Sequence, residues 1–325
     1  MQQLARKCLL VAARAWFTAT FIGTVVTAGV LCRLIHLLFF LSKRRREQLS
    51  SQAAGLCFRM IFTLNPQISI EHASEHEPAW DELFSDSDSQ PMVLINHTSP
   101  LDSIFYSACV PMRQIQNLRT LAKSSLFKIP LFGQVLTACG HFPVFFASDK
   151  PDTPLSLASS GSFSVNKEAQ EQVSKNISDY LANGGGLSMF PEGQLNRNSC
   201  RTMQTFRRGS FQLARDKRLS IWGFLHTGID AIWPVGDQFG GNPGKIRFKL
   251  FKLAIPSDVH SLEDLGHFVS HVEKLMQLEL DLMHAIDAHD AKAIKEQLAL
   301  FTAEVKATAH GDLALEHELT EALRM

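Results

Sequence analysis

The chain has 325 residues, of which 45% are hydrophobic and 20% are charged, a composition typical of a globular protein. Lysine and arginine together number 32, as do aspartate and glutamate, so the overall charge gives no reason to expect a nucleic-acid partner. The six cysteines include no C-x-x-C pair and lack the spacing of a disulfide framework, which favours a reducing compartment. His267 and His271 have helical spacing for a metal site, but no third ligand is obvious and we expect no metal.

Residues 15–32 are uncharged and predict a helix of ~27 Å, close to the ~30 Å hydrocarbon thickness of a bilayer. A basic cluster lies at 43–46. One interpretation is a single spanning helix with Arg33 extended to the headgroups and the cluster on the cytoplasmic side. The others are a helical pair in the plane of one leaflet, continued by residues 53–64, and a cleavable targeting peptide. In the first two, the basic cluster attracts anionic membrane lipid.

The rest of the chain alternates short apolar strands with helices. A helix is expected over residues 47–64 and a strand over 67–71, followed by an acidic surface loop to residue 90. Further strands are predicted at 92–96, 118–122, 142–146, 187–190, 231–235 and 245–255. Further helices are predicted at 102–110, 127–137, 167–182 and 208–216, and then over nearly all of 262–325, with breaks around His289 and Gly311.

This alternation predicts an α/β fold, in which a mixed sheet is flanked by helices. An N-terminal membrane helix precedes the sheet, and a helical C-terminal extension follows it. We therefore divide the chain into membrane-anchoring helices at residues 1–66, a central α/β domain at 67–260 and the helical extension at 261–325.

The segment 96–102, NHTSPLD, follows a predicted buried strand and opens a predicted helix. Ser99 can act as the N-cap, and Pro100 suits the first helical position. This fold-back allows the Asp102 carboxylate to reach the imidazole of His97, fix its tautomer and stabilise its protonated form. Such a pair is the His–Asp half of a catalytic triad, with a substrate hydroxyl as the nucleophile. The alternative is that Asp102 only caps the helix and that His97 is a loop residue.

The tetrapeptide FPEG at 190–193 follows another predicted strand. It places Glu192 at the carboxyl edge of the sheet, where ligands of α/β folds bind, although most Pro-Glu-Gly turns are only turns. Several arginines follow, and two of them directly precede a predicted helix whose N-terminus favours phosphate. The alternative is a solvated basic face. These arginines are Arg197, Arg201, Arg207 and Arg208.

In this order the segments resemble the glycerolipid acyltransferase family, which includes the 1-acylglycerol-3-phosphate acyltransferases. The resemblance covers residues 91–255. NHTSPLD matches the family's first motif (HX4D), and FPEG matches the third. Residues 206–214 look like the segment that follows the third motif, and Trp233-Pro234-Val235 resembles the fourth. Residues 122–144 are similar to the second block, with Lys123, Pro130, Gly133 and Gly140 in the expected order.

The resemblance implies a membrane-bound enzyme that transfers a fatty acyl group from acyl-CoA, or acyl-carrier protein, to the free hydroxyl of lysophosphatidic acid. The product is phosphatidic acid, in phospholipid biosynthesis. His97 is the implied base and Asp102 its partner, with no metal or bound cofactor. The membrane is the endoplasmic reticulum, facing the cytoplasm, in a eukaryote, or the inner membrane in a bacterium. The implied substrate-binding residues are Asn96, Ser99, Lys123, Glu192, Gly193, Arg197, Arg201 and Arg207.

Two departures from the family bear on the acceptor. The family commonly has an arginine after FPEG and another after the second block, whereas this chain has Leu195 and Phe146 in those regions. Both arginines are associated with the acceptor's phosphate, and an apolar residue removes a bidentate contact. Arg197 or Arg201 can substitute from a shifted position. Otherwise the acceptor is another lysophospholipid, the protein binds lipid without catalysis, or water replaces the acceptor and the protein hydrolyses thioesters.

Overall fold

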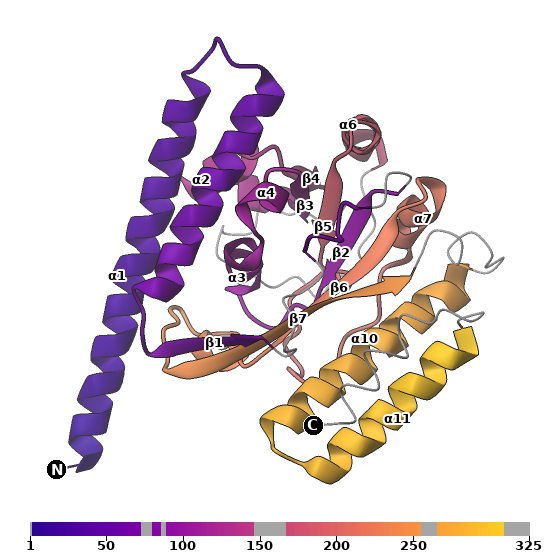
Figure 1. Cartoon of the computed structure of the whole chain (residues 1–325). Helices are drawn as coiled ribbons and strands as arrows, with labels where there is room; N and C mark the ends of the chain where they lie inside the picture. The colour runs from indigo at the N-terminus through magenta and orange to yellow at the C-terminus, as the bar shows by residue number, and fades with distance from the viewer. Residues whose placement is uncertain (1, 73–79, 86–88, 146–166, 255–264, 309–325) are drawn as a thin grey trace.

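The computed structural model describes residues 2–72, 80–85, 89–145, 167–254 and 265–308, which Figure 1 draws in colour. Its strands are β1 (Ile68–His72), β2 (Pro91–Ile95), β3 (Leu118–Lys123), β4 (Phe142–Val144), β5 (Gly186–Met189), β6 (Ser220–Thr227) and β7 (Gly244–Ala254). Its helices are α1 (Gln2–His36), α2 (Lys43–Thr63), α3 (Asp102–Cys109), α4 (Met112–Ile115), 3-10 helix η1 (Ser124–Lys128), α5 (Phe132–Ala138), α6 (Lys167–Ala182), α7 (Arg208–Asp216), α8 (Ile229–Ile232), α10 (Leu265–Asp287) and α11 (Ala291–Thr308).

The strands form a seven-stranded mixed sheet in the order β1-β7-β6-β2-β5-β3-β4. All neighbours are parallel except β6 and β7, which run antiparallel. The carboxyl ends of β2, β5 and β3 therefore meet at one edge of the sheet. His97 follows β2, Glu192 follows β5, and Lys123 ends β3, so the topology brings these three side chains to the same edge.

Helices cover both faces of the sheet, as the alternation of β2 shows. Val93 and Ile95 point into a hydrophobic cluster with residues of α1 to α5. Met92 and Leu94 point to the opposite face, into a cluster with residues of α6, α7 and α10. Figure 1 shows the long α1–α2 hairpin along one side of the molecule and α10 with α11 on the other. The predicted α/β fold, a mixed sheet flanked by helices, is confirmed.

Several predicted elements match the structure closely. The helices expected at 167–182 and 208–216 have the predicted bounds. The C-terminal helices break at His289, which adopts a φ of 53°, as expected. The second break, expected around Gly311, lies outside the described residues, as does Phe146.

Three expectations about the central domain need correction. The helix expected at 127–137 is divided into η1 and α5, since Pro130 disfavours helical geometry in the residue before it. Residues 231–235 are not a strand, because Gly228, with a φ of 80°, ends β6 and starts the short helix α8. The expected elements do not include β6 itself. All of its residues are buried, so no polar–apolar alternation marks it, and Gly223 interrupts its apolar run.

The apolar helix α1 lies along the α/β domain. By length and composition it could cross a membrane. However, Nη2 of Arg14 is 2.7 Å from Oδ2 of Asp237, and Nε2 of His36 is 3.1 Å from the carbonyl oxygen of Ala138. Between these two contacts, the ring of Phe21 packs edge-on against Trp233 with centroids 5.2 Å apart. The uncharged segment 15–32 is thus fastened to the domain at both of its ends.

A buried ion pair joins α2 to the sheet. The guanidinium of Arg119 on β3 contacts the carboxylate of Glu47 on α2, and their side chains are only 14% and 9% exposed. The same guanidinium lies 3.8 Å from the ring centroid of Tyr180 on α6. Arg119 therefore links three elements, and it is the nearer of two basic partners of Glu47, since Nζ of Lys43 lies 3.9 Å from the same carboxylate.

We expect Arg119→Ala to lower the free energy of unfolding by roughly 3 kcal/mol, because it leaves the buried Glu47 carboxylate with only the exposed Lys43 ammonium, 3.9 Å away, as a partner. The control is Arg113→Ala, which removes an exposed ion pair with Asp81 and should cost less than about 1 kcal/mol. Urea unfolding in mild detergent measures both. Equal losses in the two variants would show that burial does not govern the Glu47 pair.

Candidate active site

His97 and Asp102 are in direct contact. Nδ1 of His97 is 2.8 Å from Oδ2 of Asp102, which is completely buried. The same oxygen accepts the backbone N–H groups of Thr98 at 2.6 Å and Ser99 at 2.8 Å. The loop between β2 and α3 thereby holds the Asp102 carboxylate in place. The carboxylate in turn fixes the His97 tautomer with a proton on Nδ1.

The local sequence explains this fold-back. Asp102 is the first residue of α3, and its N–H donates to the carbonyl of Ser99, while the Ser99 hydroxyl accepts from the N–H of Leu101. The Ser99 hydroxyl also donates to the carbonyl of Trp233 at 2.8 Å. The Asp102 carboxylate bonds back to the preceding loop rather than to its own helix. The geometry therefore favours the His–Asp pair over a simple helix cap.

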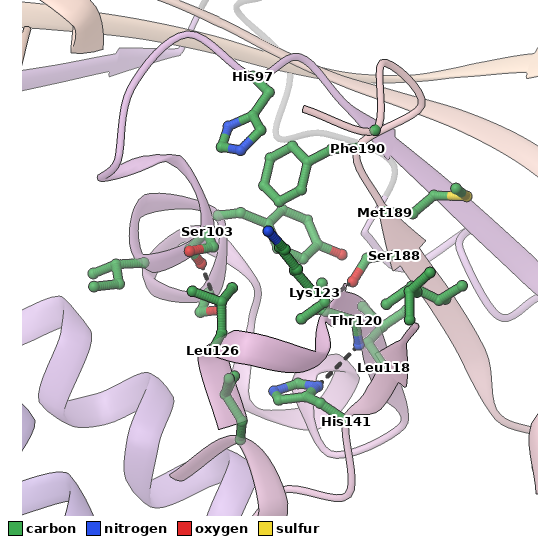
Figure 2. Close-up of a pocket in the computed structure, with 18 of the residues that line it drawn as sticks. His97, Ser103, Leu118, Thr120, Lys123, Leu126, His141, Ser188, Met189 and Phe190 are labelled. Atoms are coloured by element: carbon green, nitrogen blue, oxygen red, sulfur yellow. Dashed lines mark hydrogen bonds between the residues drawn. The ribbon is translucent and has the colours of Figure 1, made fainter. Parts of the chain in front are cut away.

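The other side of the His97 ring faces a cavity. The ring stacks on Phe190, with centroids 4.1 Å apart and planes inclined by 25°. Figure 2 shows the two rings side by side near Lys123. The His97 side chain is 22% exposed. No hydrogen bond to Nε2 is found among the residues that the structure describes, so this nitrogen can accept a proton from a molecule in the cavity.

Glu192 holds the same loop from the neighbouring strand. Its Oε1 accepts the backbone N–H of His97 at 3.0 Å, and its Oε2 accepts from the N–H of Gln204 at 2.9 Å and from the side chain of Asn196 at 3.3 Å. Burial raises the pKa of Glu192 to about 7, against the opposing effect of the Gln204 and His97 N–H groups. Glu192 is 1% exposed, so its carboxylate supports the site from inside the protein.

His226, near the end of β6, lies directly behind Asp102. Its Nε2 is 3.5 Å from Oδ1 of Asp102 and 3.2 Å from the carbonyl oxygen of Asn96. The Asn96 side chain in turn exchanges two hydrogen bonds with the His226 backbone, at 2.9 and 3.0 Å. Sequence spacing could not reveal this contact, because it depends on β2 and β6 being neighbours in the sheet.

The cavity beside His97 has a volume of about 980 Å³, the scale of a large ligand site. Small and apolar residues of α2 and α3, such as Ala54, Phe58 and Ile104, line one part of it. Basic and polar residues line another part. They include Lys123, Arg197, Arg207 and Arg208. The cavity therefore has an apolar region and a cationic region, with His97 in its wall.

The structure divides the predicted substrate-binding residues into three groups. Lys123, Gly193, Arg197 and Arg207 line the cavity. Asn96, Ser99 and Glu192 are buried and use their polar atoms on the protein itself. Arg201 is exposed on the loop against α10, where its carbonyl accepts from Gln277.

Two further features of the site bear on its chemistry. Leu195, which stands near the family's arginine position, is 7% exposed and also lines the cavity. Among the described residues, no group of three or more histidine, cysteine, aspartate or glutamate side chains is arranged to hold a metal ion. His271 instead lies 3.1 Å from the Glu304 carboxylate.

A histidine oriented by a buried aspartate, beside a large cavity at the carboxyl edge of a mixed sheet, is an arrangement suited to general-base chemistry. The family model described as Acyltransferase matches residues 72–225 of this chain. Strand β2, His97 and Glu192 lie within the matched region, and His226 is the first residue after it.

Two curated relatives are both called 1-acyl-sn-glycerol-3-phosphate acyltransferase. The protein from Cocos nucifera is 26% identical over 189 residues, which are 58% of this chain and 53% of that protein. This chain thus spans about half the length of the coconut relative. The protein from Saccharomyces cerevisiae is 24% identical over 253 residues, which are 77% of this chain and 70% of that protein.

A solved structure shares the fold. The 1-acyl-sn-glycerophosphate acyltransferase PlsC from Thermotoga maritima superposes with a TM-score of 0.61 at 16% identity. The superposition covers 86% of this chain and 98% of that one. The mixed sheet with its flanking helices is therefore shared with PlsC over nearly the whole of the Thermotoga chain.

The raised pKa of Glu192 predicts a pH-dependent contribution to stability. The pKa rises from 4.5 to about 7 in the folded state, so the folded protein holds this proton more tightly than the unfolded chain. The resulting stabilisation is fully present below pH 4.5 and is lost as the pH rises through 7. We expect the free energy of unfolding of wild type, relative to Glu192→Gln, to fall by roughly 3 kcal/mol across that range.

Urea unfolding of both proteins at a series of pH values measures this difference. The subtraction removes the other titrating groups that the two proteins share. A difference that stays constant with pH would contradict the assignment of the raised pKa to this carboxyl.

Proposed function

We propose that this protein is an O-acyltransferase that moves a fatty acyl group from a thioester, acyl-CoA or acyl-carrier protein, to the hydroxyl of lysophosphatidic acid. The observation that carries the proposal is the buried Asp102 carboxylate on Nδ1 of His97, with Nε2 of the same ring turned to the cavity. The names of the two curated relatives support the same reaction.

The chemistry follows from the orientation of His97. Nε2 accepts the proton of the acceptor hydroxyl while the hydroxyl oxygen attacks the thioester carbonyl. The Asp102 carboxylate stabilises the imidazolium that forms. Collapse of the tetrahedral intermediate breaks the C–S bond, and the departing thiolate takes the proton back from Nε2. The ring ends neutral, and no covalent acyl-enzyme is required.

The cationic part of the cavity suits the acceptor's phosphate. The Arg207 Nε lies 3.4 Å from the Glu192 carbonyl oxygen, and the side chain packs over Gly193, where a Cβ would lie only 2.9 Å from that Nε. Arg207 is thereby fixed beside the cavity, with Arg197 and Lys123 also in its wall. These charges can take the place of the arginine that the family commonly has near position 195, where this chain has leucine. Guanidinium groups bind phosphate bidentately. Lysophosphatidic acid is therefore the acceptor that we propose.

The apolar part of the cavity suits the fatty chain. It extends below His97 between α2, α3 and the sheet, where Ala54, Phe58 and Leu118 line it. Burying a chain there removes apolar surface from water at both the ligand and the wall. The same site thus holds a hydrocarbon chain and a phosphate on two sides of the proposed base.

We also propose that the α1–α2 hairpin attaches the enzyme to one leaflet of a membrane, with the hairpin in the interface. Leu37, Phe39 and Phe40 in its connecting turn are 69%, 86% and 73% exposed. Leu34 in α1 and Leu56 in α2 extend this apolar surface. Because the uncharged segment 15–32 of α1 is held to the α/β domain at both of its ends, an interfacial position fits it better than a crossing.

We expect His97→Ala to lower the rate of acyl transfer by roughly 10²- to 10⁴-fold, the usual contribution of a general base. The assay follows labelled acyl-CoA or acyl-carrier protein with a panel of lysophospholipids. His267→Ala, an exposed histidine of α10, is the matched control and should keep full activity.

Each alternative has its own result in this assay. A preference for lysolipids with larger or uncharged headgroups would replace lysophosphatidic acid as the acceptor. Release of free fatty acid without lysolipid would identify a thioester hydrolase. Binding of acyl-CoA by folded wild-type protein without any turnover would show a lipid-binding protein that does not catalyse transfer.

We expect the double substitution of Phe39→Ser and Phe40→Ser to weaken vesicle binding by at least about tenfold, since each buried phenylalanine contributes about 1.5–3 kcal/mol. Flotation with liposomes that contain anionic lipid measures the binding. Leu300→Ser is the control, because Leu300 is 53% exposed on α11, on the other side of the sheet. Unchanged flotation together with resistance to alkaline carbonate would indicate a spanning helix instead.

A further inference from the structure

The two oxygens of Asp102 have very different surroundings. Oδ2 accepts from His97, Thr98 and Ser99, whereas Oδ1 is buried and makes no hydrogen bond within the usual distance to any described residue. The nearest basic nitrogen on that side is Nε2 of His226, at 3.5 Å. A buried carboxylate oxygen is costly without a donor, so this contact requires an explanation.

The neighbours of His226 define its tautomer. Nε2 faces two acceptors, the carbonyl oxygen of Asn96 at 3.2 Å and Oδ1 of Asp102. A bare Nε2 would direct its lone pair at both oxygens, so the proton must be on this nitrogen. Nδ1 is buried and makes no hydrogen bond to the described residues, and the Phe105 ring lies edge-on to the imidazole at 5.9 Å.

The ring is also uncharged. Burial lowers the pKa of His226, and this effect outweighs the opposing attraction of Asp102. The other titratable groups that face the ring are His97, which acts in the same direction as burial, and Asp230, which opposes it. Glu192 lies beyond them on the loop after β5. His226 is therefore a neutral donor of a single N–H at neutral pH.

We propose that His226 is a positioning residue for acyl transfer, whose Nε2–H holds Oδ1 of Asp102 and so keeps Oδ2 directed at His97. The inference rests on the proposed function, because it gives His226 a role through the His97–Asp102 pair. The apo distance of 3.5 Å is long for a hydrogen bond, and such contacts shorten when the site is loaded.

The donor has an electrostatic consequence for the base. With the His226 N–H present, the negative charge of Asp102 is stabilised at both oxygens. Without it, the carboxylate attracts the His97 imidazolium more strongly, and His97 remains protonated to higher pH. Since only the neutral ring of His97 can accept a proton from the acceptor, the variant enzyme becomes active only at higher pH.

The test compares His226→Phe with His226→Gln. Phenylalanine keeps an aromatic ring against Phe105 but removes the N–H, whereas the glutamine amide can restore a donor to Asp102. For His226→Phe we expect kcat to fall by about tenfold, which corresponds to about 1.4 kcal/mol. KM for both substrates should stay unchanged, and the acid limb of the kcat/KM profile should move to higher pH. His226→Gln should recover part of both effects.

A second measurement does not depend on turnover. The nitrogen-15 NMR shifts of the His226 ring in folded wild-type protein should show a protonated Nε2 and a bare Nδ1 at neutral pH. A proton on Nδ1, or on both nitrogens, would overturn the inference. So would a folded His226→Phe enzyme with the wild-type kcat and pH profile.

These results separate the inference from the proposed function. If wild type transfers acyl groups and His226→Phe behaves like wild type, the inference alone fails. If folded wild type acylates no lysolipid, the proposed function fails, and the role of His226 in acyl transfer fails with it. The NMR result then still decides whether Nε2 of His226 carries the proton that a contact with Asp102 requires.

Discussion

Oδ2 of Asp102 accepts hydrogen bonds from the imidazole of His97 and from the backbone of Thr98 and Ser99. Burying a carboxylate completely costs free energy unless hydrogen-bond donors surround it. Here the donors come from the loop between β2 and α3, whose conformation the carboxylate holds. The carboxylate therefore needs the loop for its hydrogen-bond donors, and the loop needs the carboxylate to keep its conformation. Asp102 also begins α3, where the helix N-terminus favours a negative charge.

Two carboxylates serve the same histidine in different ways. Asp102 contacts the His97 ring, whereas Glu192 accepts the His97 backbone N–H from the loop after β5. Asp102 has dense donors on one oxygen, but desolvation dominates at Glu192 and raises its pKa to about 7. Asp102 is therefore suited to stabilising a charged imidazole, and Glu192 to keeping the two strand-end loops together.

The sequence was sufficient to predict the parts of the site that are close together in the chain. His97 and Asp102 are separated by one strand-to-helix junction, so local geometry was enough to predict their contact. The contacts of Glu192 and His226 with this loop depend on the order β6-β2-β5, which no single segment encodes. The strand β6 itself lacks alternation because it is buried on both faces. Asn96 shows the same limit, since its partner lies 130 positions away.

The α2 helix connects the site to the exposed apolar surface of the hairpin. Ala54 and Phe58 line the cavity, while Leu56 and Met60 on the same helix are 53% and 44% exposed. Gly55 lets the helix approach α4, since a Cβ there would meet the Ile115 side chain at 2.7 Å. One helix therefore separates the hydrocarbon region of the cavity from the surface that we place against lipid. The surface and the cavity wall are thus two faces of one helix, so attachment of the hairpin to a leaflet would hold the hydrocarbon region of the cavity beside the membrane, which a simple tether would not do.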